Sequence, residues 1–137
     1  MSPEQLLGQL EADGRVVVAD FEAGLGTLSR MKPGQLDVLL VVAEPTVKSL
    51  EVARRAVEMI RERNAGRAMV VANRVASDED RELVRSAFRG DDVIAVPDDP
   101  AIRAADAQGV APFDAAPDAP AVRALRALAE TLVAGES

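Results

Sequence analysis

Polar side chains follow four short apolar runs of this sequence, at positions where a ligand could bind. These polar positions are Asp20, Glu44, Asn73 with Arg74, and Pro97 with Asp98 and Asp99. A carboxylate such as that of Asp20 can hold a hard cation, and the Asn73 amide can both donate and accept a hydrogen bond. The plainer interpretation is that strands simply end in turn residues. Polar residues nevertheless follow each of the four successive apolar runs, and this repetition favours a binding site.

The elements that must position these side chains are short apolar runs alternating with longer segments of helical periodicity. Buried strands are expected over residues 15–20, 37–43, 68–72 and 92–96, which are rich in valine and too short for helices. Helices are expected over residues 2–13, 47–63, 101–107 and 122–132, with one more that Ser77 and Asp80 cap. This alternation predicts an α/β fold with a mostly parallel sheet of about four strands and helices on both faces. In such sheets ligands bind beyond the carboxyl ends of the strands.

The first expected helix has both a cap and an apolar stripe. The cap is a capping box formed by Ser2, Pro3 and Gln5, and the stripe is formed by Leu6, Leu7 and Leu10. A chain that opens with its own cap is expected to begin at an element boundary. The length predicts one domain over residues 1–137, in which the proline-rich residues 112–120 form a loop before the C-terminal helix.

The composition excludes several classes of function. The 137 residues carry a net charge of −7 and contain three Phe, no Trp and no Tyr, so the basic surface and stacking platforms of a nucleic-acid-binding protein are missing. Cysteine and histidine are absent, which excludes disulfides, zinc sites of the Cys/His kind and histidine general-base chemistry. No apolar run is long enough for a membrane span and no targeting segment is visible. A cytoplasmic protein is therefore expected.

A set of short motifs carries a resemblance to a known family. The motifs are Asp20-Phe21-Glu22-Ala23-Gly24, Leu28-Ser29-Arg30, Glu44-Pro45-Thr46, Asn73-Arg74, Pro97-Asp98-Asp99, and Ala105-Asp106 with Gly109. Taken together they resemble the deviant-Walker ATPases of the MinD/ParA type. The closest resemblance is to the CooC-like branch, which inserts nickel into carbon monoxide dehydrogenase. The similarity covers residues 6–134, nearly the whole chain.

The resemblance implies a nucleotide site that binds ATP or ADP weakly. It implies that Asp20 holds Mg²⁺ through water and that the region of Gly24 senses the terminal phosphate. It also implies that Asn73 meets the adenine edge, while a turn at residues 97–99 closes over the base. The cofactor-binding positions carried over are Asp20, Glu22, Gly24, Asn73, Arg74, Pro97, Asp98 and Asp99. No catalytic residue is carried over.

One departure from the family pattern limits this expectation. These ATPases open with a strand and a glycine-rich loop whose lysines cradle the phosphates. The sequence contains no such loop, since Lys32 precedes a Pro-Gly turn and Lys48 lies in the first turn of an expected helix. The chain alone is therefore not expected to hydrolyse ATP. Because the family's phosphate-loop strand lies between two of the expected strands, either residues 16–20 pair directly with residues 38–42 or another chain fills the slot.

Functions of different classes stay open at this point. The chain is either a nucleotide-binding half-domain that works with a separate phosphate-loop-bearing chain, or a degenerate interaction or regulatory module, expected as a homodimer, that no longer binds nucleotide. A phosphoacceptor receiver-like domain is a third interpretation, although it would require paired acids after the first strand and a lysine after the last. Nickel delivery is not carried over, because that branch is expected to use cysteines and the sequence has none.

Overall fold

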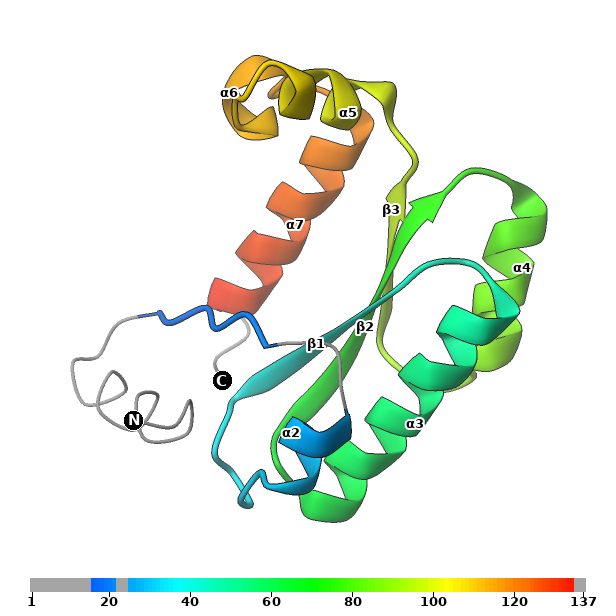
Figure 1. Ribbon diagram of the computed structural model, residues 1–137, viewed down its shortest axis with the longest axis vertical. Coiled ribbons are helices and arrows are strands. Elements are labelled where there is room, and N and C mark those ends of the chain that lie inside the picture. The colour runs from blue at the N-terminus through cyan, green and yellow to red at the C-terminus, as the bar shows by residue number, and fades with distance from the viewer. Residues whose placement is uncertain (1–15, 22–24, 135–137) are drawn as a thin grey trace.

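The computed structural model describes residues 16–21 and 25–134 and confirms the predicted α/β fold (Figure 1). In chain order its elements are α2 (Leu25–Ser29), β1 (Val38–Ala43), α3 (Val47–Arg63), β2 (Arg67–Val75), α4 (Asp78–Ala87), β3 (Val93–Pro97), α5 (Pro100–Ala107), α6 (Pro112–Ala115) and α7 (Pro120–Ala134). The helix expected over residues 2–13 lies outside the described residues. Within the described part of the chain, no helix is long and apolar enough to cross a membrane.

The sheet formed by the described residues is parallel, with the strand order β1-β2-β3. β1 pairs with β2 from Val38 opposite Arg67 to Ala43 opposite Ala72, and Val70 of β2 lies opposite Val93 of β3. β2 is central, and its residues 69–72 are all buried. A strand covered on both faces needs such an unbroken apolar run, so this element follows directly from its sequence.

The strand expected over residues 15–20 is not formed by the described residues 16–20, and the sheet has three strands in place of about four. Val16 and Val18 are 70% and 90% exposed. The physical reason is that a valine-rich run becomes a strand only where a neighbouring backbone offers hydrogen-bond partners. Direct pairing of residues 16–20 with residues 38–42, one of the two ways to fill the slot, does not occur among the described residues.

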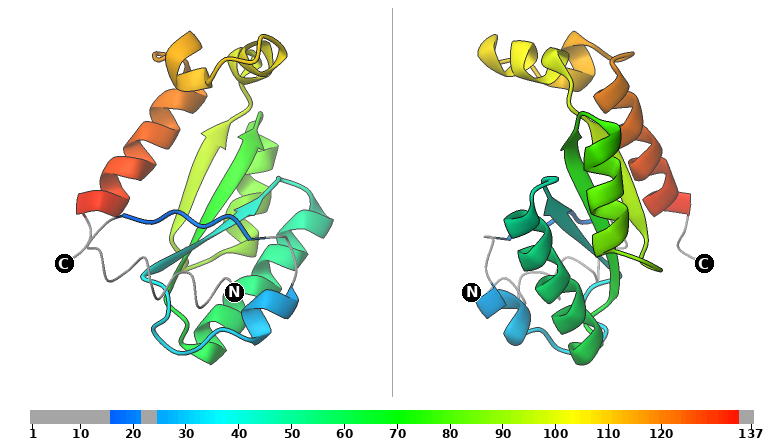
Figure 2. Two further views of the ribbon diagram at one scale, coloured as in Figure 1. Left: turned by 60° about the vertical axis from the view of Figure 1, so that its left-hand side comes forward. Right: turned by 90° about the vertical axis from the view of Figure 1, so that its right-hand side faces the viewer.

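Helices cover the two faces of the sheet unequally (Figures 1 and 2). The larger core lies under α3 and α4 and consists of Ala43, Leu50, Ala53, Val57, Val70, Ala72, Val75, Val84 and Phe88. The smaller core lies under α7 and consists of Met69, Val71, Val96, Ala121 and Leu128. Side chains of β2 alternate between these two cores, as the period of two along a strand requires.

The boundaries of α3 match the expected helix over residues 47–63. Its buried stripe is Leu50, Ala53, Val57 and Ile60, as the helical spacing predicts. Thr46 Oγ1 accepts a hydrogen bond from the Ser49 N–H at the first turn, and Asn64 ends the helix with a φ of 51°. Gly66 follows at a close approach of two backbones, where a Cβ would collide with the Leu36 carbonyl, so glycine is required there.

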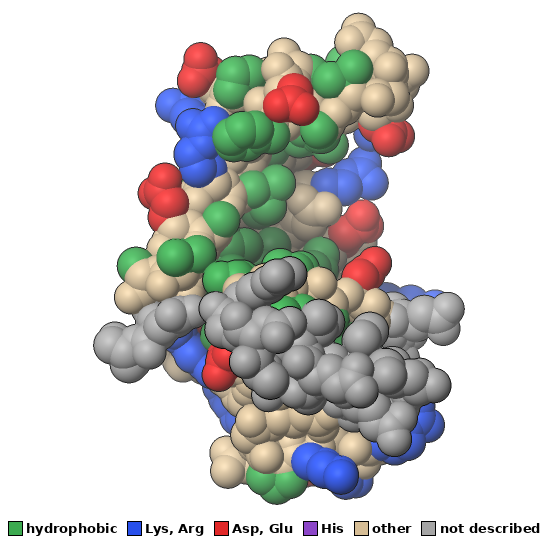
Figure 3. All heavy atoms as spheres, turned by 90° about the vertical axis from the view of Figure 1, so that its left-hand side faces the viewer, with side chains coloured by type: hydrophobic (Ala, Val, Ile, Leu, Met, Phe, Trp, Pro, Cys, Tyr) green, Lys and Arg blue, Asp and Glu red, His purple; other side chains and the backbone are tan. Residues whose placement is uncertain are grey.

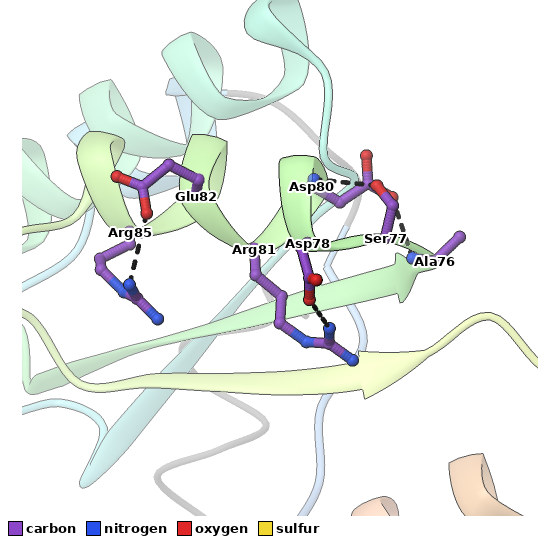
Figure 4. Close-up of polar contacts among 7 residues, drawn as sticks. All are labelled: Ala76, Ser77, Asp78, Asp80, Arg81, Glu82 and Arg85. Carbon is purple, nitrogen blue, oxygen red and sulfur yellow. Dashed lines mark hydrogen bonds and ion pairs between the residues drawn. The ribbon is translucent and has the colours of Figure 1, made fainter.

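The acidic segment that opens α4 is a helix cap, which confirms its interpretation from the sequence (Figure 4). Ser77 Oγ accepts a hydrogen bond from the Asp80 N–H at 3.1 Å, and the Asp80 carboxylate accepts one from the Ala76 N–H at 2.9 Å. This pattern resembles a capping box, except that the carboxylate accepts from the N–H of the residue before the N-cap. Asp78 forms an exposed ion pair with Arg81 at 2.7 Å. Asp80 thus satisfies a backbone donor, and the acidic residues together complement the helix dipole.

The proline-rich residues 112–120 contain the short helix α6 where the sequence predicts only a loop. Pro112 stands at its first position, where a fixed φ favours a helical turn, and the Ala116 N–H donates to the Pro112 carbonyl at 2.9 Å. The segment then turns into α7, which begins at Pro120. Figure 1 shows α5 and α6 beyond the carboxyl ends of β2 and β3, so this region borders the edge where a ligand is expected.

Candidate functional site

Three side chains from three strand ends meet at the carboxyl edge of the sheet. Arg74, near the end of β2, lies between Glu44, which follows β1, and Asp98, which follows β3. Arg74 Nη1 is 3.5 Å from Glu44 Oε1, and Arg74 Nε is 3.5 Å from Asp98 Oδ1. All three side chains are about half exposed. Since exposed ion pairs of this kind contribute less than about 1 kcal/mol, the guanidinium can leave either carboxylate at little cost.

The backbone beside this cluster departs from a regular strand. The register between β2 and β3 shifts between Ala72 and Val75, so the predicted Asn73-Arg74 motif forms a bulge. Arg74 has a φ of 60°, and a non-glycine residue in this left-handed region costs about 1 kcal/mol or more. Bulges are frequent next to binding sites, where they re-aim side chains. The irregular backbone at this edge of the sheet therefore coincides with the motif to which the resemblance assigns contact with the base.

In the turn predicted at residues 97–99, Asp98 and Asp99 have different partners. Pro97 ends β3, and the Asp98 N–H donates to the Val75 carbonyl at 3.0 Å, which holds the turn against β2. Asp99 instead accepts hydrogen bonds from the Ala121 and Ala101 N–H groups, both at 3.0 Å. These bonds, that of Ala121 first, lower the pKa of Asp99 below its ordinary value. Asp98 therefore belongs to the cluster, whereas Asp99 caps α5 and joins it to the start of α7.

Of the residues expected near the phosphates, the structure describes only Asp20. Asp20 lies at an exposed place in the segment 16–21, while Glu22 and Gly24 lie outside the described residues. Over residues 16–21 and 25–134, no three acidic side chains gather as ligands for a cation. Mg²⁺ that accompanies a nucleotide is usually held by one or two carboxylates together with waters and the phosphates, so a single carboxylate such as that of Asp20 is compatible with such a site.

The cluster also contains a pairing that the sequence does not predict. The sequence places Glu44 at this edge but gives no reason to pair it with Arg74. One signal was available, because Arg74 is the only cation among the polar residues that follow the expected strands. The left-handed backbone of Arg74 has no such signal, because this conformation is uncommon for residues other than glycine, asparagine and aspartate.

Three curated proteins are similar to this chain. Two are uncharacterized ATP-binding proteins of Methanocaldococcus jannaschii. The first is 32% identical over 84 residues, which cover 61% of this chain and 33% of that protein. The second is 34% identical over 74 residues, which cover 54% of this chain and 28% of that protein. The third is the carbon monoxide dehydrogenase accessory protein CooC of Rhodospirillum rubrum, 30% identical over 102 residues that cover 74% of this chain and 39% of that protein. The chain thus spans well under half the length of each relative.

The fold is also similar to a solved structure, the cell division ATPase MinD of Pyrococcus furiosus. The TM-score is 0.60 with 22% sequence identity, over 72% of this chain and 43% of that chain. No family model matches the sequence. These similarities confirm the predicted resemblance to MinD/ParA-type and CooC-like ATP-binding proteins, and the described fold corresponds to part of a MinD-type ATPase fold.

Proposed function

We propose that this chain is a nucleotide-binding half-domain, equivalent to the carboxyl part of a MinD/ParA/CooC-like ATPase, which binds the base side of ATP or ADP and does not hydrolyse ATP alone. The observation that carries the proposal is the meeting of Glu44, Arg74 and Asp98 beside Asn73 at the carboxyl edge of the sheet. The similarity to ATP-binding proteins supports the class of ligand.

On the base side, each residue of the cluster has a distinct task. The Asn73 amide offers one donor and one acceptor, which the edge of adenine can match. Arg74 exchanges one of its exposed carboxylate partners for a position against the face of the base, where a guanidinium binds an aromatic ring favourably. Asp98, whose backbone N–H is bonded to Val75, stays beside the guanidinium as its second carboxylate partner.

The phosphate side depends on a segment that is not in this sequence. The 137 residues contain no glycine-rich loop with a lysine, and β1 has no strand on its outer side among the described residues. In this proposal a separate phosphate-loop-bearing chain pairs its strand with that open edge of β1, because unpaired backbone groups of an apolar edge require partners. The loop would supply lysine and backbone N–H groups to the phosphates, and Asp20 would support Mg²⁺ through water.

Titration of the purified chain with a fluorescent ADP analogue tests the base-side assignment. We expect weak binding that Asn73→Ala reduces more than Glu22→Gln does. Arg74→Gln is expected to weaken binding several-fold, whereas the matched control Arg85→Gln, which removes only an exposed ion pair with Glu82 on α4, leaves it unchanged. Equal effects of Asn73→Ala and Glu22→Gln, or a larger effect at Glu22, would contradict the assignment.

The chain alone is expected to show no ATP turnover, because neither Lys32, which precedes a Pro-Gly turn, nor Lys48, in the first turn of α3, belongs to a glycine-rich phosphate loop. Phosphate release by the purified chain is the measurement. Turnover that survives thorough purification and disappears in Asp20→Asn would overturn this part of the proposal, since a contaminating ATPase would not respond to that substitution.

A second candidate function is a non-catalytic interaction or regulatory module that acts as a homodimer. The open edge of β1 favours it, because a second copy could cover the same backbone groups. Light scattering over a wide range of concentrations, combined with the nucleotide titration, separates the two functions. A concentration-dependent dimer that binds no nucleotide supports the module, and a monomer that binds ADP supports the half-domain.

A further inference from the structure

The face of the sheet on the α7 side is only partly covered. Along β1, Leu39, Val41 and Ala43 pack into the clusters on the α3 side. The alternate residues Leu40 and Val42 therefore face the α7 side, and they are 40% and 64% exposed. We refer to these two side chains as the open apolar face.

The neighbouring strands show what this face lacks. On the same side of the sheet, Met69 and Val71 of β2 and Val96 of β3 are buried together with residues of α7. Figure 3, which looks at the molecule from the side of α7, shows apolar side chains gathered between this helix and the strands. The layer under α7 thus covers β2, β3 and the start of β1, where Val38 packs against the same core, but Leu40 and Val42 stay exposed. A sheet face of this kind needs a further element to exclude water from it.

The first described segment enters the structure on this same side. Figures 1 and 2 show residues 16–21 running from the α7 side of the sheet past β1 toward α2. At the end of this segment, Phe21 packs against the cluster of Met31, Leu39 and Ile60 on the α3 side. The described segment 16–21 therefore begins on the side of the open apolar face.

The sequence before Val16 has the chemistry and the length to cover that face. Residues 2–13 carry one apolar stripe, Leu6, Leu7 and Leu10, on an otherwise polar helical pattern. As an α-helix these residues would be about 18 Å long, and a strand of six residues such as β1 is about 20 Å long. In the sequence only Gly14 and Arg15 stand between this stretch and Val16, and a glycine can adopt the conformation of a sharp turn.

We propose that residues 2–13 form a helix whose leucine stripe packs on Leu40 and Val42, beside α7, and completes the second layer of the sheet. The segment is preferred to a second copy of the chain because a link of two residues keeps it at a high effective concentration on the correct side. A helix on the face uses none of the backbone groups at the edge of β1, so that edge stays available for a strand. This inference does not depend on nucleotide binding.

Paired cysteines test the proposal cleanly, because the natural chain has none. Leu10→Cys with Leu40→Cys is compared with the matched pair Ala12→Cys and Leu40→Cys, in which the first cysteine lies on the opposite side of the expected helix at nearly the same chain position. After equilibration in a glutathione redox buffer, peptide mass spectrometry is expected to find at least tenfold more intrachain disulfide for the Leu10 pair. Equal yields, or no disulfide in either pair, would overturn the proposal, and so would a disulfide that links two chains.

Hydrogen exchange provides a second readout that requires no crosslink. Leu6→Asp with Leu10→Asp is expected to speed amide exchange of the β1 peptide at least tenfold, while the control Gln5→Asp with Ala12→Asp adds the same two charges to the polar side and leaves that exchange unchanged. Unchanged exchange in the leucine variant would contradict the proposal. Exchange that depends on protein concentration in the unaltered chain would show that a second copy covers the face instead, and would also contradict it.

Discussion

Two nearly identical runs of this sequence have opposite environments. Residues 69–72 read Met-Val-Val-Ala, and residues 16–19 read Val-Val-Val-Ala. The first run is the centre of β2, where Ala72 is fully buried, whereas the second forms no strand and leaves Val18 90% exposed. β2 has a strand on either side and helices over both faces, and residues 16–19 have no paired strand in the described structure. The valine-rich composition of a run therefore indicates that its side chains favour burial, but the run forms a strand only where neighbouring strands can pair with it.

The exposed run therefore points to a neighbour that the described residues do not supply. Val16 and Val18 each leave most of their surface in water, which is unfavourable by roughly 25 cal/mol for each Å² of apolar area. A strand placed between residues 16–20 and β1 would give both of them backbone partners and apolar contacts. The same slot is the one that the proposed phosphate-loop-bearing chain would fill, so the comparison and the proposed function lead to the same edge.

The largest expected effect comes from placing one charge in each run. Val70→Asp puts a carboxylate at a position that is 1% exposed, and we expect it to lower the free energy of unfolding by more than about 4 kcal/mol. Val18→Asp is expected to change it by less than about 0.5 kcal/mol, because the side chain is already in water. Urea denaturation followed by circular dichroism measures both. A similar loss in the two variants would show that residues 16–19 are buried in solution.

A smaller effect is expected at the entry to β2. Gly66→Ala places a Cβ against the Leu36 carbonyl and the Leu39 side chain, so we expect it to destabilise the fold by about 1–3 kcal/mol. Gly26→Ala is the control, because a Cβ at that position meets no atom within 4 Å, and in α2 it should be neutral or stabilising by up to about 1 kcal/mol. Equal denaturation midpoints for both variants would show that the loop before β2 yields without cost.

Asp99 gives an expected pH dependence at the end of β3. Because its hydrogen bonds lower the pKa of Asp99 in the folded state, its contribution is fully present above the unfolded value of about 3.9. That contribution is lost as the pH falls through the lower folded-state pKa. Asp99→Asn should therefore be less stable than the natural chain at neutral pH, with a difference that narrows in acid. Denaturation midpoints across this range measure it, with Asp118→Asn as the charge control. A constant difference would contradict the assignment.

The smallest expected change in stability is at Arg74, where two effects oppose each other. Arg74→Gly relieves the cost of a left-handed φ, which is worth up to about 1 kcal/mol. It also removes two exposed ion pairs worth less than about 1 kcal/mol each. We expect thermal stability to stay nearly unchanged while affinity for ADP falls. Lower stability together with unchanged affinity would assign Arg74 a structural role only.

The sequence predicts much of this fold because local signals and burial agree in its central part. The stripe of Leu50, Val57 and Ile60, and the caps at Thr46 and Ser77, specify their helices without help from distant residues. Residues 16–20 show the limit of such prediction, since pairing is a property of two segments and a run cannot reveal that its partner is missing. One part of the candidate site is likewise predictable from local sequence and another part is not. Strand ends are predictable from apolar runs, but the meeting of Arg74 with two carboxylates requires the register of three strands.

The central claim is that nucleotide binds at the carboxyl edge formed by Asn73, Arg74 and Asp98. Its most direct test is an NMR titration of the isotope-labelled chain with ADP, which reports on every backbone amide at once. We predict that the amide signals of these three residues shift together with rising ADP, while those of residues 16–20 do not, because the phosphate loop is not part of this chain. Shifts confined to residues 16–20, or no shifts at the strand ends at millimolar ADP, would contradict the claim.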